Sequence, residues 1–349
     1  MPELPGPSPA ERRAREPWSA EPRPPEPPTS ATRRIPSPVT LVQRVWARVP
    51  AVLCVVVAVA AILRLTVRDR WPVVAVLVYA TPPVVLAAVM FVAGALWFLR
   101  REPRYSLLAL AVAVAFQFWW ATASWVLNPP SPENSPPGTV RGLFWNLRRG
   151  DNGWEEVSAR IQEWDPDVAW FVEAEEPGGG APWLEELRGY DTRRVGDGLV
   201  VIARGTIGVV RPFPVGTHGH GAEIWVAAKN QTFGSVVVDL DSSLFARRRE
   251  QFEELNREIE AMRDPPAIIA GDFNTPRDSI HLDSLRKSFR NAFEVAGRGY
   301  DATWPLPVPL ICIDQIWAAE RGAAIRSCRL PWTRASDHRP VLIEFTAGQ

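Results

Sequence analysis

Three long apolar runs near the beginning of the chain constrain its fold more than any other feature. None of them contains a charged side chain, and only a few residues separate one run from the next. About 20 apolar residues in a helix cross the hydrocarbon layer of a bilayer, whereas a soluble protein would need a very large helical core to bury all three. The first run is short for a bilayer unless it extends past Arg64, whose side chain can reach the interface. We therefore predict transmembrane helices at about residues 49–67, 71–99 and 105–127.

Arginines beside these runs predict their orientation. Seven lie on the side of the N-terminus and of the second loop, and three lie on the opposite side. Because loops rich in Arg and Lys stay in the cytoplasm, the N-terminus is expected inside and everything after Leu127 outside. We expect an integral protein of a bacterial-type inner or plasma membrane, with the lipid bilayer as its partner. No protein partner can be inferred.

Two proline-rich segments frame the apolar region. Residues 1–40 hold 12 of the 35 prolines together with many charges, so we predict a disordered tail. Residues 128–139, with the sequence NPPSPENSPPGT, are predicted to form a stiff linker between the membrane and the rest of the chain.

The part that follows, residues 140–349, has the pattern of one mixed domain. Strand-like apolar runs alternate with two helical stretches, Asp151–Trp164 and Phe245–Arg263. Residues 141–349 carry 25 basic and 31 acidic side chains. A basic nucleic-acid-binding module is excluded, because phosphate contacts need a cationic surface. The alternation predicts an α/β sandwich.

Near the C-terminus two apolar runs, Ile311–Ala319 and Ala323–Leu330, are predicted to form a hairpin that turns at Glu320–Gly322. Cys312 and Cys328 would then face each other, and either a disulfide or two buried thiols is compatible with this arrangement. The chain has three cysteines in all, which excludes a disulfide-rich scaffold and a four-cysteine zinc site.

Polar side chains stand where the predicted strands of this domain end. Each alone has an ordinary explanation, such as an Asx turn at Asp272 or a helix cap at Asp337. Asp314 is different, because it lies inside an apolar run and a buried carboxylate needs a partner. His338 is the natural partner. The complete set is Asn146, Glu173, Asp239, Asp241, Asp272, Asn274, Asp314, Asp337 and His338.

These residue types supply a specific chemistry. Carboxylate and amide oxygens from Glu173, Asn146 and Asp337 suit a hard cation such as Mg²⁺, with Mn²⁺ as an acceptable substitute. Zinc would favour cysteine or clustered histidine. A metal beside a base and a carboxylate-oriented imidazole favours in-line attack of water on phosphorus.

The order of the motifs WN, VE, GDFN, ID and SDH resembles the endonuclease/exonuclease/phosphatase superfamily, over about Val140–Phe345. The resemblance implies the DNase I-like fold, a four-layer sandwich of two packed β-sheets flanked by helices, here preceded by the transmembrane helices. The active site would lie at one end of the sandwich. Glu173 is similar to the main metal ligand, Asn146 to a ligand or phosphate contact, and Asp337 to the residue that completes the metal environment.

The same resemblance implies the roles of the remaining residues. Asp272 would activate the attacking water. His338, oriented by Asp314, would stabilise charge on the phosphorus or protonate the leaving oxygen. Asn274 would hold the scissile phosphate, so that Asn146, Asn274 and His338 together contact the substrate.

Two positions depart from the family pattern. Asp239, in the run VDLD, stands where many relatives carry a histidine, and an ionised carboxylate cannot donate a hydrogen bond to phosphate. That contact is lost or replaced, unless Asp239 binds metal instead. Arg148 stands where relatives that act on damaged DNA often have a second acid. The histidines of the run THGHG, His218 and His220, are expected on a solvated loop.

The expected function is therefore hydrolysis of a phosphodiester or phosphomonoester by a membrane-anchored, Mg²⁺-dependent enzyme. Its substrate is a lipid, a small molecule or a nucleic acid, and the acidic domain disfavours the last of these. Two alternatives remain open: a nuclease acting outside the cytoplasm, and a catalytically silent scaffold or receptor that keeps the fold.

Overall fold

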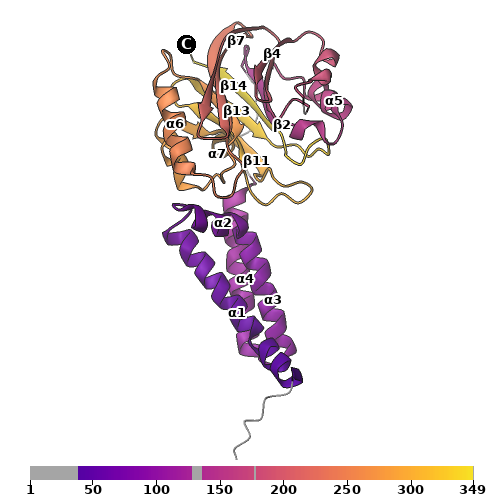
Figure 1. Cartoon of the computed structure of the whole chain (residues 1–349), viewed down its shortest axis with the longest axis vertical. Coiled ribbons are helices and arrows are strands. Elements are labelled where there is room, and N and C mark those ends of the chain that lie inside the picture. Colours follow the sequence, from indigo (N-terminus) through magenta and orange to yellow (C-terminus); the bar gives the residue numbers. More distant parts are fainter. Residues whose placement is uncertain (1–37, 128–135, 177, 349) are drawn as a thin grey trace, which may run out of the picture. The chain divides into compact units, whose positions relative to one another are not determined.

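A computed structural model describes residues 38–127, 136–176 and 178–348. Its first stretch holds four helices, each beginning at a proline: α1 (Pro38–Thr66), α2 (Pro72–Ala80), α3 (Pro83–Leu99) and α4 (Pro103–Ser124) (Figure 1). Proline suits the first turn of a helix, where its missing N–H has no intrahelical acceptor. Helix α1 thus begins within the segment 1–40, and the predictions made for residues 1–37 and 128–135 lie outside the described residues.

Two of these helices are long and apolar enough to cross a membrane. They are the 21-residue part of α1 at Trp46–Thr66 and the 22-residue helix α4. Helices α2 and α3 meet at 65° and provide a third span only if the bent pair counts as one. The bend falls at Pro82–Pro83, where the missing N–H groups interrupt the helical hydrogen bonds. The structure therefore supports two or three spans.

The rest of the chain forms two β-sheets. The eight-stranded sheet has the order β1-β11-β13-β14-β2-β3-β5-β4, and the six-stranded sheet has the order β10-β12-β9-β8-β7-β6. The strands of the first sheet are β1 (Trp125–Val126), β2 (Val140–Asn146), β3 (Val168–Val172), β4 (Asp191–Gly196), β5 (Leu199–Ala203), β11 (Gly297–Tyr300), β13 (Ala323–Arg329) and β14 (Val341–Ala347). Those of the second are β6 (Thr206–Val215), β7 (Gly219–Ala228), β8 (Gln231–Asp239), β9 (Ile268–Asp272), β10 (Phe289–Asn291) and β12 (Asp314–Ala319).

Alternating side chains of the strands build the layers. On β2, Phe144 enters the core between the sheets, whereas Trp145 joins the outer cluster with helix α5 (Trp154–Trp164). Helix α6 (Arg248–Glu260) covers the outer face of the other sheet through Phe252. A short helix, α7 (Ala292–Ala296), lies between β10 and β11 in the chain. Helices α5 and α6 flank the sheets on opposite sides (Figure 1), which confirms the predicted four-layer sandwich.

The predicted hairpin around Glu320–Gly322 is wrong. Strand β12 pairs with β9 and β10 in the six-stranded sheet, whereas β13 pairs with β14 and β11 in the other. The short turn carries the chain from one sheet to the other, because β12 is buried between two strands and has no free edge for β13. Cys312 and Cys328 are both free and buried, so the disulfide alternative is wrong as well.

Candidate active site

Three adjacent strands of the six-stranded sheet bring three aspartates into one row. Strands β8 and β9 are parallel, with Asp239 opposite Asp272, and β12 is antiparallel to β9, with Asp314 opposite Asp272. The register alone therefore gathers residues that are up to 75 positions apart in the sequence. Like charges this close raise the free energy of the fully ionised state, so the row needs a compensating positive charge.

Two parallel strands of the eight-stranded sheet end beside this row. Strand β2 ends at Asn146, and Glu173 follows directly after β3. Asn146 Nδ2 donates to Glu173 Oε1 at 3.0 Å and to Asp272 Oδ2 at 3.0 Å, so one amide joins the two sheets. Glu173 and Asn274 have φ angles of 47° and 45°. Non-glycine residues keep such left-handed backbone only where the surrounding structure holds them, which is common at functional sites.

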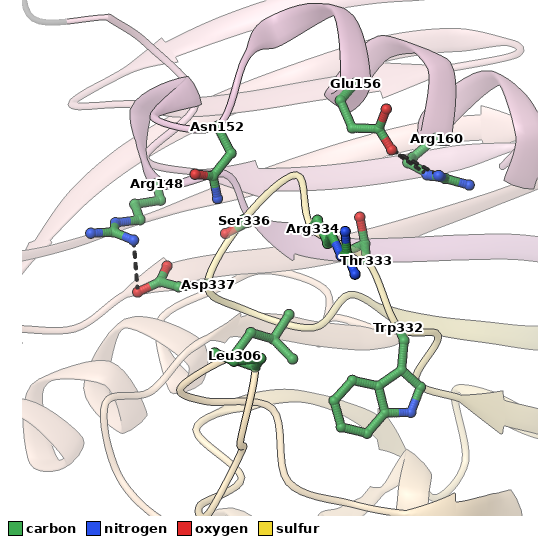
Figure 2. A pocket seen from close by; sticks show the side chains of 11 residues that line it. Arg148, Asn152, Glu156, Arg160, Leu306, Trp332, Thr333, Arg334, Ser336 and Asp337 are labelled. Carbon is green, nitrogen blue, oxygen red and sulfur yellow. Dashed lines mark hydrogen bonds and ion pairs between the residues drawn. The ribbon is translucent and has the colours of Figure 1, made fainter.

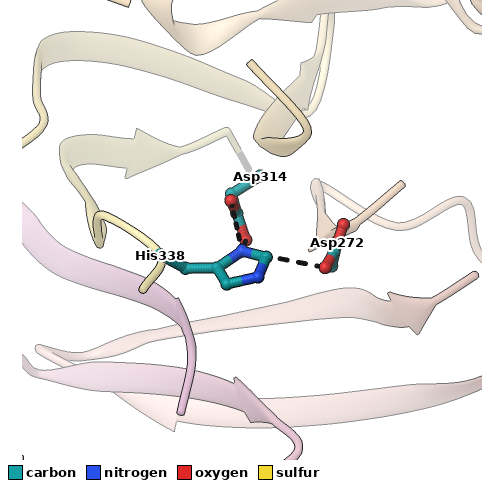
Figure 3. Close-up of side chains that lie close together, drawn as sticks. All are labelled: Asp272, Asp314 and His338. Carbon is teal, nitrogen blue, oxygen red and sulfur yellow. Dashed lines mark hydrogen bonds and ion pairs between the residues drawn. The ribbon is translucent and has the colours of Figure 1, made fainter. Parts of the chain in front are cut away.

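His338 lies on the loop before β14 and reaches the aspartate row. Its Nδ1 is 2.9 Å from Asp314 Oδ2 and 3.8 Å from Asp272 Oδ2 (Figure 3). The loop is fixed on both sides of this histidine, because Trp145 Nε1 donates to the His338 carbonyl at 3.0 Å and Ser336 Oγ donates to the Asn146 carbonyl at 2.8 Å. The imidazole is thus held by its backbone as well as by its carboxylate partner.

Burial and neighbouring charges shift the protonation of this cluster. Burial, followed by the charge of Asp314, raises the pKa of Asp272 to about 7. Burial also raises the pKa of Asp239 well above its usual value, and the charges of Asp272 and Glu173 add to this effect. For His338 burial acts in the opposite direction, but the Asp314 carboxylate outweighs it and raises the pKa to about 10. A base that titrates near neutrality therefore lies next to a protonated imidazole.

Asp337 lies at the edge of the cluster and has one oxygen without a hydrogen bond. Its Oδ2 accepts from Trp304 Nε1 at 3.3 Å and lies 3.6 Å from Arg148 Nη1. Its Oδ1 is buried, has no hydrogen-bond partner among the residues that the structure describes, and lies 3.9 Å from His338 Nε2. A buried carboxylate oxygen without a partner is costly, so a ligand is expected there.

The donors present fit the divalent cation that the sequence predicts. Glu173 offers a carboxylate whose side chain is 35% exposed, Asp337 offers its unpaired oxygen, and the crowded aspartates favour positive charge. Ligand atoms of Asp272, Asp314 and His338 also lie within 4.8 Å of one another. However, Asp314 already binds His338 Nδ1, so this trio is better suited to proton transfer than to metal binding.

The two amides have partners that limit their roles. Asn146 Oδ1 accepts from the Arg148 N–H at 2.9 Å, so in this arrangement its nitrogen rather than its oxygen faces Glu173. Asn274 Nδ2 donates to the Leu240 carbonyl at 2.8 Å, which uses one of its two amide hydrogens.

One histidine and one arginine lie differently from what the sequence indicates. The solvated-loop prediction is wrong for His220, which lies on β7 opposite Asp239 with its Nε2 3.8 Å from Asp239 Oδ2. A glycine-rich sequence occurs in loops and also in paired strands, so the run THGHG does not distinguish between the two. His218 is exposed in the preceding turn. Arg149, whose Nε lies 3.8 Å from Glu173 Oε2, was not predicted at the site, because only the left-handed backbone of the turn brings it there.

Comparisons with known proteins agree with this architecture. The profile described as the endonuclease/exonuclease/phosphatase family matches residues 143–338. A protein of that family from Bacteroides thetaiotaomicron has 16% identity and a TM-score of 0.51, and the match covers 62% of this chain and 100% of that one. Because its identity is low, this likeness establishes the fold alone.

Two further solved structures are similar at lower scores. The human Nocturnin catalytic domain with bound sulfate has 17% identity and a TM-score of 0.48, covering 61% of this chain and 96% of that one. A mannosyl-6-phosphatase from Bacteroides thetaiotaomicron has 18% identity and a TM-score of 0.48, covering 59% and 99%. No curated protein sequence matches the chain.

Proposed function

Because the chain belongs to the endonuclease/exonuclease/phosphatase family, we propose that it is a membrane-anchored, Mg²⁺-dependent phosphoesterase. The observation that carries the proposal is the Asp272–His338–Asp314 cluster, joined through Asn146 to the Glu173 carboxylate. A base, a protonated donor and metal-binding oxygens then lie around one position, which is what the hydrolysis of a phosphate ester requires.

The residues divide the reaction between them. Glu173 and Asp337 would hold the cation, with Asn146 beside them, and the cation would supply positive charge to the phosphoryl oxygens. Asp272, whose pKa is raised to about 7, takes the proton of the attacking water. His338 donates from Nε2 to the leaving oxygen while Asp314 keeps Nδ1 in place. Asn274 presents its remaining amide hydrogen to the phosphate.

Hydrolysis by the whole chain tests the proposal. The full-length protein is the proper sample, because β1 precedes the linker and pairs with β11, so a fragment starting at residue 140 would lack a strand. In detergent micelles with Mg²⁺ we expect hydrolysis of bis(p-nitrophenyl) phosphate that EDTA abolishes. His338→Ala should lower the rate by about 10²–10³-fold, the usual effect of losing a donor to developing charge.

A matched histidine provides the control. His218 is exposed in the turn before β7, so His218→Ala should retain the wild-type rate. Equal rates for His338→Ala and wild type would rule out this cluster as the source of the hydrolysis. No hydrolysis of any phosphoester in a panel of nucleic acids, phosphoinositides and phosphorylated sugars would favour the silent scaffold instead.

We also propose that the N-terminus is cytoplasmic and the catalytic domain extracytoplasmic. The proposal rests on the seven arginines against three beside the apolar runs, and it requires the bent pair α2–α3 to count as one span. A C-terminal alkaline phosphatase fusion should be active in cells and a C-terminal green fluorescent protein fusion dark. The reverse result would place the domain in the cytoplasm.

A further inference from the structure

A large pocket opens directly beside the catalytic cluster. It has a volume of about 980 Å³, and Asp337, whose Oδ1 lies 3.9 Å from His338 Nε2, forms part of its wall (Figure 2). A group bound in this pocket would therefore lie close to the reacting phosphate.

Three arginines line this pocket, which we call the arginine pocket: Arg148, Arg160 and Arg334. Trp332 and Thr333 also belong to its wall. Two of the three are paired. Arg160 binds Glu156 at 2.8 Å and Glu163 at 2.6 Å, and Arg148 lies 3.2 Å from Asp151 and 3.6 Å from Asp337. Arg334 is exposed, and within the described part of the chain no carboxylate lies at ion-pair distance from it.

The pocket also offers an aromatic surface. Trp332 is 58% exposed, which is unusual for an indole, and the Arg339 guanidinium lies over its ring at 4.5 Å. That stacking fixes the orientation of the ring. A planar group of a ligand can therefore pack against Trp332 while Arg334 binds a nearby anion in the two-pronged geometry that guanidinium groups favour.

The wall of the arginine pocket carries three arginines and two carboxylates, those of Glu156 and Asp337, in a domain that is acidic as a whole. Residues 141–349 carry 25 basic and 31 acidic side chains, so the surrounding field repels long polyanions while the pocket attracts a single anionic group. We propose that the arginine pocket binds a second anionic group of the substrate, so that the enzyme prefers small phosphoesters that carry a further phosphate near a planar ring. This inference rests on the proposed function and names the substrate class for that site.

A matched pair of substrates tests the inference with the full-length protein in micelles and Mg²⁺. The first is the p-nitrophenyl ester of thymidine 5′-monophosphate, and the second is the same compound with an added 3′-phosphate. We expect kcat/KM to be at least about tenfold higher for the second, because only the second carries a phosphate that can form a charge-assisted pair with Arg334. Arg334→Ala should lower this preference about tenfold, and Arg334→Lys should restore part of it.

The control is Arg326→Ala, since Arg326 is an exposed arginine of β13 outside the pocket. It should change neither the rates nor the preference. Equal kcat/KM for both substrates in the wild type, or an unchanged preference in Arg334→Ala, would overturn the inference while leaving the proposed function intact.

Calorimetry separates the two claims if neither compound is hydrolysed, a result that would count against the proposed function. Thymidine 3′,5′-bisphosphate should then still bind more tightly than thymidine 5′-monophosphate, and Arg334→Ala should remove the difference. Equal binding of the two nucleotides would overturn the inference, whatever the outcome for the proposed function.

Discussion

The residues of the candidate active site fall into two regions that differ in their access to solvent. In the buried centre the side chains of Asp272, Asp314 and His338 are 3%, 0% and 8% exposed. On the rim Glu173 and Asp337 are 35% and 23% exposed. Water does not screen the charges of the centre, so their mutual interactions set the protonation states. The rim carboxylates are partly exposed, so solvent reaches them.

This difference predicts two kinds of defect. Removing a group of the centre should lower the rate at every metal concentration, because the proton chemistry itself is lost. Removing a rim carboxylate should instead weaken metal binding, and added metal should restore the rate.

The largest effect is expected for Asp272→Asn. The variant keeps the size of the side chain but cannot take a proton from water, so kcat should fall by about 10²–10⁴-fold. Steady-state rates measured from micromolar to tens of millimolar Mg²⁺ should stay low throughout. Asp264→Asn, at an exposed acid that precedes the start of β9, whereas Asp272 is the last residue of that strand, should match the wild type. Recovery of the rate at high Mg²⁺ would show that Asp272 acts through metal binding, as the rim carboxylates do.

A smaller effect, dependent on pH, is expected for Asp314→Asn. The Asp314 carboxylate raises the pKa of His338 to about 10, so the protonated donor persists through neutral pH and is lost only as the pH rises through that value. Without this charge the pKa falls, and the alkaline limb of the pH–rate profile moves to lower pH. The rate drops about tenfold for each unit by which the pKa lies below the assay pH. An unchanged limb would show that another group controls it.

The centre could be predicted largely from the sequence, whereas its surroundings could not. Asp314 inside an apolar run needs a partner, and His338 in a polar motif supplies one, so burial alone indicates the pair. The same logic fails for the pocket. Trp332 and Arg334 stand in an ordinary polar stretch of the sequence. They line the same pocket only because their loop folds beside Asp337.

The fold shows the same division. Along β2, successive side chains point to opposite faces of the sheet, and both faces are buried. This alternation depends only on neighbouring residues, so the sequence predicts it. Pairing partners are not local. The run that ends at Ala319 and the one that begins at Ala323 satisfy the pattern of a hairpin, yet they belong to different sheets. Similarly, nothing in the run THGHG indicates that His220 lies opposite Asp239.

On the rim, Glu173→Gln should change the metal requirement more than the chemistry. The neutral amide keeps one oxygen but loses the charge, so the Mg²⁺ concentration that gives half-maximal rate should rise on the order of tenfold. At saturating Mg²⁺ the rate should return to within a few-fold of the wild type. Glu185→Gln, at an exposed glutamate, should not alter the Mg²⁺ titration. A loss of rate that excess metal does not recover would contradict the division between centre and rim.

The smallest effect is expected for Asp239→Asn. Asp239 lies between the two regions, so this variant shows whether it belongs with the centre or with the rim. Its pKa is raised by burial and by the charges of Asp272 and Glu173, so ionising it costs folding free energy. The penalty is absent at low pH and grows as the pH rises above the usual range of an aspartate.

In EDTA at pH 8, Asp239→Asn should therefore raise the free energy of unfolding by about 1 kcal/mol, or the unfolding temperature by about 2–4 °C. Tryptophan fluorescence during heating would measure this, and the gain should shrink towards pH 4 as the wild-type carboxyl becomes protonated. The Mg²⁺ requirement should change only a few-fold. A tenfold increase like that expected for Glu173→Gln, combined with no gain in stability, would identify Asp239 as a metal ligand and extend the rim into the aspartate row.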